Sequence, residues 1–149
     1  MKTLEGTVVR RATPEDAPRL AALSGELGYP ASSEDIGRRV AELAERADAL
    51  ILVAELMPGD IVGWIHGTEQ LLLESGRRCE LVGLVVDPRA RGRGVGRRLV
   101  AEVETWAAGR GIRQMAVRSN VTREESHPFY ERLGYTRVKT QHAYRKRLG

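Results

Sequence analysis

Residues 80–98 read ELVGLVVDPRARGRGVGRR, and this stretch decides the fold. Its first part, 80–86, is nearly all apolar, which is typical of a central strand that is covered on both faces. The pair Asp87-Pro88 ends the strand. Three glycines at alternate positions from Gly92 then let the backbone turn tightly ahead of a helix. Successive N–H groups in such a turn can point into one concavity, which predicts a pocket for a pyrophosphate.

The residues that follow this stretch predict a βαβ unit. Apolar residues at helical spacing indicate a helix from Gly94 to Gly109 or Gly111, and residues 112–119 are typical of a strand. Because a crossover of this kind is almost always right-handed and joins parallel strands, the strands over 80–86 and 112–119 should be parallel.

The rest of the chain predicts a mixed α/β fold, with a mostly antiparallel sheet and helices on both faces. The pattern does not decide whether residues 69–76 form a loop or continue the preceding strand. In chain order, the other predicted elements are a strand over 7–10, helices over 13–27 and 33–47, an antiparallel hairpin over 49–56 and 61–66, a helix over 126–133, and a closing hairpin with strands over 135–139 and 142–147.

Length and composition limit the possible classes of protein. The chain has 149 residues, the usual size of one domain, so we expect residues 1–149 to form a single domain. The one cysteine, Cys79, excludes an internal disulfide and a Cys-rich metal site. The three histidines share no metal-ligand spacing, so we expect no bound metal.

Hydropathy and charge point to a cytoplasmic protein that binds charged molecules. The longest apolar run, Ala49 to Ala54, is far shorter than the roughly 20 residues that span a bilayer, and the first residues do not form a signal peptide. Residues 1–75 carry 7 Lys and Arg against 13 Asp and Glu, whereas residues 76–149 carry 17 against 7. The acidic first half is suited to a cation and the basic second half to an anion, although surface charge kept for solubility would give the same counts.

The glycine-rich turn does not match two common nucleotide-binding patterns. The pattern GxxxxGK[ST] of nucleoside triphosphatases is absent. The dinucleotide pattern GxGxxG would need a third glycine where Arg97 stands. Five arginines within residues 89–98 nevertheless provide positive charge suited to phosphates.

A third pattern does match, because Arg91-Gly92-Arg93-Gly94-Val95-Gly96 resembles the (Q/R)xxGx(G/A) signature of the GNAT superfamily of acyl-CoA-dependent N-acetyltransferases. The flanking Leu84-Val85-Val86-Asp87-Pro88 and Arg98-Leu99-Val100 are also similar to its central motif. Downstream, Ser119-Asn120 and Phe129-Tyr130-Glu131-Arg132-Leu133-Gly134-Tyr135 resemble its later motif. The order and spacing cover the chain from about residue 7 to 147.

This resemblance implies a donor site for acetyl-CoA where the central parallel strands, ending at Val86 and Asn120, splay apart. Backbone groups of the first strand would pair with the pantetheine arm like an extra strand. Asn120 would bond a pantetheine amide, or it simply forms a strand-end turn. The residues expected to bind the cofactor are Leu84, Val85, Val86, Arg91, Gly92, Arg93, Gly94, Val95, Gly96, Arg97, Asn120, Phe129 and Tyr130.

The same resemblance implies roles in acyl transfer from a thioester to an amine. Tyr130, in the family's Phe-Tyr position, is the candidate acid that protonates the leaving thiolate, and its alternative role is that of a core aromatic. The amide of Val85 or Val86 is the expected oxyanion donor. Glu80 is the candidate general base, and its alternative is a solvated strand residue. Nothing next to Cys79 in the sequence would activate it as a nucleophile.

We therefore expect an N-acetyltransferase that moves an acetyl group from acetyl-CoA to a primary amine, with a cationic acceptor and a homodimeric assembly. The alternative is a non-catalytic module that senses acyl-CoA or binds nucleic acid through the Arg/Gly-rich turn. Aromatic residues make up 5% of the chain and do not interleave with the arginines, which disfavours nucleic acid.

Overall fold

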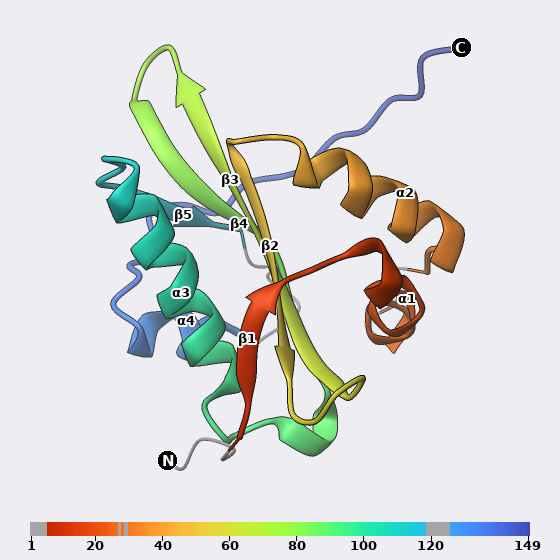
Figure 1. Cartoon of the computed structure of the whole chain (residues 1–149). Coiled ribbons are helices and arrows are strands. Elements are labelled where there is room, and N and C mark those ends of the chain that lie inside the picture. The colour runs from red at the N-terminus through yellow and green to blue at the C-terminus, as the bar shows by residue number, and fades with distance from the viewer. Residues whose placement is uncertain (1–5, 27, 29, 119–125) are drawn as a thin grey trace. The chain divides into compact units, whose positions relative to one another are not determined.

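The computed structural model describes residues 6–26, 28, 30–118 and 126–149, and the chain divides into two compact units, Met1–Val117 and Arg118–Gly149 (Figure 1). The elements of the first unit are β1 (Val8–Arg11), the 3-10 turn η1 (Pro14–Asp16), α1 (Ala17–Glu26), α2 (Ser33–Ala44), β2 (Ala49–Glu55), β3 (Ile61–Leu72), β4 (Gly76–Val86), the 3-10 turn η2 (Pro88–Ala90), α3 (Val95–Gly109) and β5 (Met115–Val117). The second unit contains α4 (Ser126–Arg132).

The five strands form one sheet in the order β1-β2-β3-β4-β5. The first three pairs are antiparallel, and β4 and β5 are parallel. Helices α1 and α2 pack on one face of the sheet and α3 packs on the other (Figure 1). The predicted mixed sheet, the hairpin of β2 and β3 and the βαβ unit of β4, α3 and β5 are therefore confirmed.

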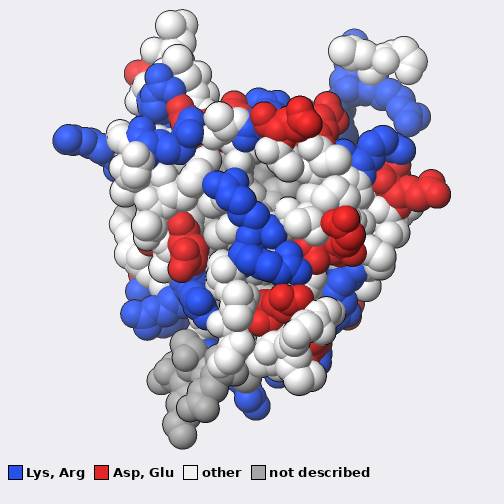
Figure 2. Space-filling view, viewed as in Figure 1, with Lys and Arg blue, Asp and Glu red and all other residues white. Residues whose placement is uncertain are grey.

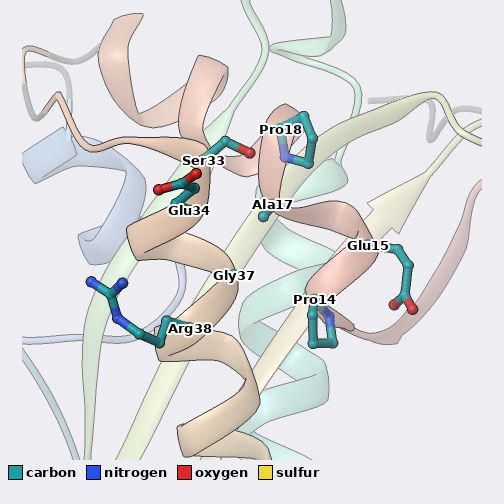
Figure 3. Close-up of a pocket in the computed structure, with 8 residues that line it drawn as sticks. All are labelled: Pro14, Glu15, Ala17, Pro18, Ser33, Glu34, Gly37 and Arg38. Carbon is teal, nitrogen blue, oxygen red and sulfur yellow. The ribbon is translucent and has the colours of Figure 1, made fainter.

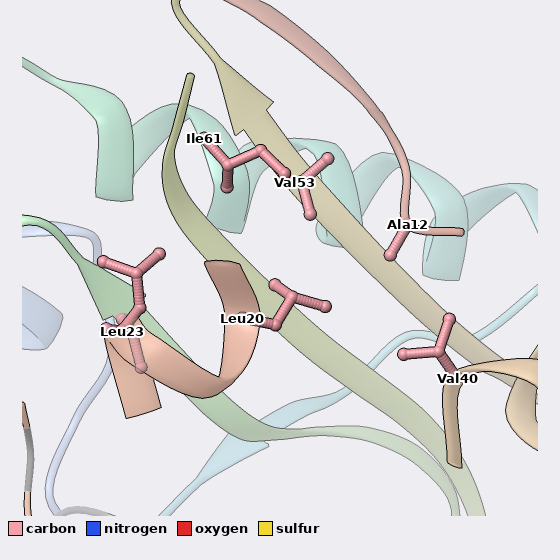
Figure 4. Packing of buried hydrophobic residues seen from close by; sticks show 7 residues of the cluster. Ala12, Leu20, Leu23, Val40, Val53 and Ile61 are labelled. Carbon is pink, nitrogen blue, oxygen red and sulfur yellow. The ribbon is translucent and has the colours of Figure 1, made fainter. Parts of the chain in front are cut away.

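Apolar side chains from both helices of one face form the main buried cluster. Leu20 and Leu23 of α1 and Val40 of α2 pack together with Val53 and Ile61 from the strands (Figure 4). The predicted cap at Thr13 is present, because the Thr13 N–H donates to Asp16 Oδ2 at 2.8 Å in a capping box. The helix expected over 13–27 begins there as the 3-10 turn η1 and becomes α1 from Ala17.

The opposite face of β3 is shaped by glycines that let α3 approach the sheet. A Cβ atom added at Gly67 would lie 2.6 Å from the Val103 Cγ1 atom, and one at Gly63 would lie 3.3 Å from the Leu99 Cδ1 atom. Both α3 residues are fully buried. The helix is thereby seated closely on the sheet, which fixes where its N-terminus lies relative to the end of β4.

A β-bulge interrupts the pairing of β3 with β4. His66 pairs with Gly83, whereas the next residue, Gly67, pairs with Leu81, so Val82 is the extra residue on β4. A bulge of this kind shifts the alternation of the strand by one residue and increases its local twist. The two halves of β4 therefore direct their backbone groups differently, with consequences for the site.

Some predicted boundaries change in the structure. Residues 69–76, left open between a loop and a strand, continue β3 to Leu72 and turn into β4 at Gly76. The strand expected over 112–119 is β5, which spans only Met115–Val117.

The closing hairpin predicted over 135–139 and 142–147 is wrong, because residues 135–149 form no strand. All side chains from Thr136 to Gly149 are exposed, and five of them are Lys or Arg. The large apolar side chains of this segment, Val138, Tyr144 and Leu148, are themselves exposed, so the alternation read from them does not produce a strand.

None of the helices in the described part of the chain has the length and apolar character that a bilayer crossing requires.

Candidate functional site

Among the described residues, no strand pairs with one edge of the C-terminal half of β4, which we call the open edge. The Asp87 N–H donates to the Val62 carbonyl of β3 at 2.8 Å, which fixes the direction of the backbone groups past the bulge. Because these groups alternate along a strand, Leu84 and Val86 direct theirs toward the other edge. On that edge β5 pairs only with Cys79–Leu81. Within the described residues, no strand covers the rest, so an extended ligand can pair there.

The turn that follows the open edge is shaped by glycine. Gly92 and Gly94 have φ angles of 75° and 83°, in the region that only glycine adopts readily. Gly94 is the N-cap of α3 and has no side chain to cap the helix. The Arg98 N–H makes a 3.0 Å bond to the Gly94 carbonyl, so the amides ahead of it are those that a helix leaves without an intrahelical partner.

These amides form the candidate anion site predicted from the sequence. The first turn of α3 contains no acidic residue, and the helix dipole favours negative charge at this end. At the other end of the turn, the Arg91 N–H already donates to the Pro88 carbonyl, over a long 3.3 Å. The arrangement can therefore receive a diphosphate on the amides that follow Arg91.

The arginines near the turn have different surroundings. Arg89 forms ion pairs with Asp60 and Asp87, and Arg98 donates to the Thr7 carbonyl. Arg93 and Arg97 are exposed and pair with no acid in the described part of the chain. Their guanidinium groups can swing toward phosphates.

Asp87 ties the turn to the rest of the first unit, a role that the sequence reasoning missed. Its Oδ2 atom accepts from Arg19 Nη2 at 2.5 Å and from Arg89 Nε at 3.0 Å. Its Oδ1 atom accepts from the Arg89 backbone N–H at 3.1 Å. Arg19 also donates to the Ile61 carbonyl at 3.0 Å. The signal in the sequence was Asp87-Pro88-Arg89, because an Asp side chain can accept a hydrogen bond from the backbone N–H two residues further on.

The ion pairs of Asp87 give stability that depends on pH. Burial of the carboxylate favours its neutral form, but the hydrogen bonds from Arg89 and the charge of Arg19 outweigh burial and lower the pKa of Asp87. The folded pKa therefore lies below the unfolded value of about 3.9, so this stabilisation is complete above about pH 4 and is lost as pH falls through the folded pKa.

We predict that Asp87→Asn lowers the urea midpoint at neutral pH and that the gap to the native chain narrows below about pH 4. Urea unfolding of both proteins at neutral pH and at two acidic values checks this. A gap of constant size across these values would contradict the assignment.

Glu80, the candidate base, is buried on β4, where its Oε1 atom lies 3.3 Å from Arg78 Nη2.

The other titratable groups near the middle of the sheet are His66 and Cys79. Burial lowers the pKa of His66, which lies on the neighbouring strand β3 and whose Nε2 atom has no hydrogen-bond partner in the described part of the chain. Burial raises the pKa of Cys79 to about 11, so this thiol is not an activated nucleophile. Among the described residues no group of three or more His, Cys, Asp or Glu could hold a metal ion.

The second unit holds the aromatic candidates. In α4 the rings of Phe129 and Tyr130 are 5.1 Å apart in an edge-to-face arrangement, and Tyr130 and Tyr135 are 5.9 Å apart. Gly134, with a φ of 92°, ends the helix as predicted, and the Tyr135 N–H donates to the Tyr130 carbonyl at 3.1 Å. These contacts fix the Tyr130 ring within its unit. Asn120 lies outside the described residues.

Two surface features complete the description of the first unit. Basic and acidic side chains are interleaved over the face shown in Figure 2. The first unit contains ion pairs such as that of Arg10 with Asp16 at 2.8 Å. A groove of about 660 Å³ separates the starts of α1 and α2 (Figure 3). Its lining consists of Pro14, Glu15, Ala17, Pro18, Ser33, Glu34, Gly37 and Arg38. None of the predicted site residues lies in it.

Comparison with known proteins gives consistent matches. The family model described as Acetyltransferase (GNAT) family matches residues 18–135. Aminoglycoside N(6')-acetyltransferase type 1 of Stenotrophomonas maltophilia is 29% identical over 136 residues, 85% of this chain and 84% of that protein. Glucosamine 6-phosphate N-acetyltransferase 1 of Oryza sativa subsp. japonica is 36% identical over 119 residues, 75% of this chain and 68% of that protein.

A solved structure shows the same fold with a ligand. An aminoglycoside N-acetyltransferase in complex with CoA superposes with a TM-score of 0.83 at 21% identity, over 95% of both chains. The family resemblance read from residues 91–96 and their neighbours is confirmed by the family match. The chain therefore belongs to the acetyltransferase (GNAT) family and is an enzyme of the GNAT type.

Proposed function

We propose that this chain transfers the acetyl group of acetyl-CoA to a primary amine by direct attack in a ternary complex. The observation that carries the proposal is the open edge of β4, which leads directly into an uncapped helix N-terminus. A strand edge suits a pantetheine arm and the helix start suits a diphosphate, in the order in which CoA contains them.

In this proposal the pantetheine arm pairs with Leu84 and Val86, and the diphosphate lies on the amides from Gly92 to Arg97. Arg93 and Arg97 neutralise its charge. Of the two amides considered as oxyanion donors, that of Val86 faces the open edge. The Val85 amide faces β3 by the same alternation, so Val86 is the better candidate.

The proton transfers are assigned to two side chains. Tyr130 protonates the leaving thiolate, which is only moderately basic because a free thiol has a pKa of about 8.5. Glu80 accepts the proton of the incoming ammonium, directly or through water. Its buried carboxylate lies on β4, close in sequence to the open edge, which supports this role.

We propose a cationic amino sugar as the acceptor. The relatives described above are named for acetylation of an aminoglycoside and of glucosamine 6-phosphate, so both names specify an amine on a sugar. The excess of acidic residues over 1–75 favours the cationic member of this pair. The proposal includes a homodimer, expected from the family resemblance, and a cytoplasmic location, expected from the hydropathy of the sequence.

Calorimetry with CoA tests the donor site, and a CoA-release assay with an amine panel tests the reaction. The panel contains an aminoglycoside, glucosamine 6-phosphate, a polyamine and a lysine peptide. We expect binding of CoA and fastest release with the aminoglycoside. Folded protein that gives no heat with CoA would overturn the proposal, and binding without turnover of any amine would indicate an acyl-CoA sensor instead.

A further inference from the structure

A side chain of the turn occupies the open edge of β4. The Arg91 Nε atom donates a 3.1 Å hydrogen bond to the carbonyl oxygen of Val86. This carbonyl is one of the outward groups that remain for an extended ligand past the bulge. The guanidinium therefore lies where the pantetheine arm would pair in the proposed function, on which this inference rests.

The Arg91 guanidinium has an alternative hydrogen-bond acceptor to the Val86 carbonyl only when the ligand carries phosphate. Its side chain is exposed, it pairs with no acid in the described part of the chain, and it precedes the amides of the candidate diphosphate site. A guanidinium bonds a phosphate more strongly than a neutral carbonyl, because that hydrogen bond is charge-assisted and can be bidentate. CoA offers this exchange, whereas pantetheine, which has no phosphate, does not.

We infer that Arg91 makes the donor site selective for phosphate-bearing thioesters. A ligand that pairs with the Val86 carbonyl displaces the guanidinium. With CoA, the displaced guanidinium bonds the diphosphate in place of the carbonyl. With pantetheine, the hydrogen bond is lost and no phosphate replaces it. Arg91 is thus a specificity-determining residue of the donor site as well as a contributor to affinity.

The test compares CoA with pantetheine on the native chain and on Arg91→Ala. Loss of the competing hydrogen bond should tighten pantetheine binding by up to about 10-fold, and loss of the phosphate contact should weaken CoA binding by about 10- to 100-fold. Calorimetry measures the dissociation constant of CoA, and NMR titration measures that of pantetheine, which binds more weakly. The two dissociation constants should thus move in opposite directions.

Two matched variants separate this role from a general effect of charge or loop shape. Arg93→Ala removes an exposed arginine that makes no hydrogen bond to β4 within the described residues, so CoA binding should weaken while pantetheine binding stays unchanged. Arg91→Gln keeps a hydrogen-bond donor without charge, so it should lose CoA affinity with a smaller gain for pantetheine. Circular dichroism checks that each variant is folded.

The outcomes distinguish the inference from the proposed function. If the native chain binds CoA but pantetheine binds Arg91→Ala no more tightly, the Val86 carbonyl accepts both partners at once. The selectivity role is then wrong, and the acetyl-CoA site stands. If the native chain does not bind CoA at all, the proposed function and the inference fail together.

Discussion

Replacing Gly94 with Asp is expected to weaken the binding of CoA by more than about 100-fold without unfolding the protein. The substitution places a carboxylate at the N-cap of α3, beside the amides that receive the diphosphate in the proposed function. At about 5 Å and an effective dielectric constant near 20, one pair of like charges costs about 3 kcal/mol, which corresponds to two orders of magnitude in affinity.

The matched control is Gly94→Asn. Asp and Asn have nearly the same size, and both tolerate the left-handed backbone that a φ of 83° requires better than other residues do. Each variant should lose some stability relative to glycine, by a similar amount. Calorimetry with CoA and thermal unfolding of all three proteins separate the two effects. Equal CoA affinities for the Asp and Asn variants would show that no anion sits at this helix end.

Replacing Tyr130 with Phe is expected to lower kcat by about 100-fold and to leave the affinity for CoA nearly unchanged. The change removes one hydroxyl and keeps the ring that packs against Phe129 and Tyr135. General acids contribute roughly 100- to 10,000-fold, and the lower end applies here because a thiolate with a pKa of about 8.5 needs only modest assistance.

Tyr135→Phe is the control for this substitution. Tyr135 belongs to the same cluster of rings, so a loss that comes from packing or from missing hydroxyls in general would appear in both variants. Steady-state rates with a saturating amine, together with calorimetry of CoA binding, provide the comparison. An unchanged kcat in Tyr130→Phe removes Tyr130 from the role of acid.

Sequence periodicity was enough to place most of the first unit. The apolar run of β4, the glycines at its end and the helical spacing from Val95 are local features, because a residue's neighbours along the chain determine them. The same holds for the capping box at Thr13, whose partner is three residues away. Local rules of this kind predicted the candidate anion site as well as the elements around it.

Features that depend on a distant partner could not be read from the chain. The extra residue at Val82 is defined only by the register of β4 against β3. The contact of Asp87 with Arg19, 68 residues apart in the chain, joins segments whose approach depends on the packed sheet. The closing hairpin failed for a related reason, since alternation within residues 135–147 is a local pattern that does not by itself supply a partner strand.

The open edge beside Leu84 and Val86 is made of main-chain groups, so it depends on the pairing of β4 with β3 more than on residue type. Any set of strand-forming side chains at these positions keeps the outward carbonyls and amides, provided that this pairing is preserved. The bulge at Val82 bends and twists the strand at the boundary between this edge and the part of β4 that pairs with β5. Evolution can therefore replace many residues along this strand and still retain a main-chain docking edge, because a ligand that pairs there contacts peptide groups.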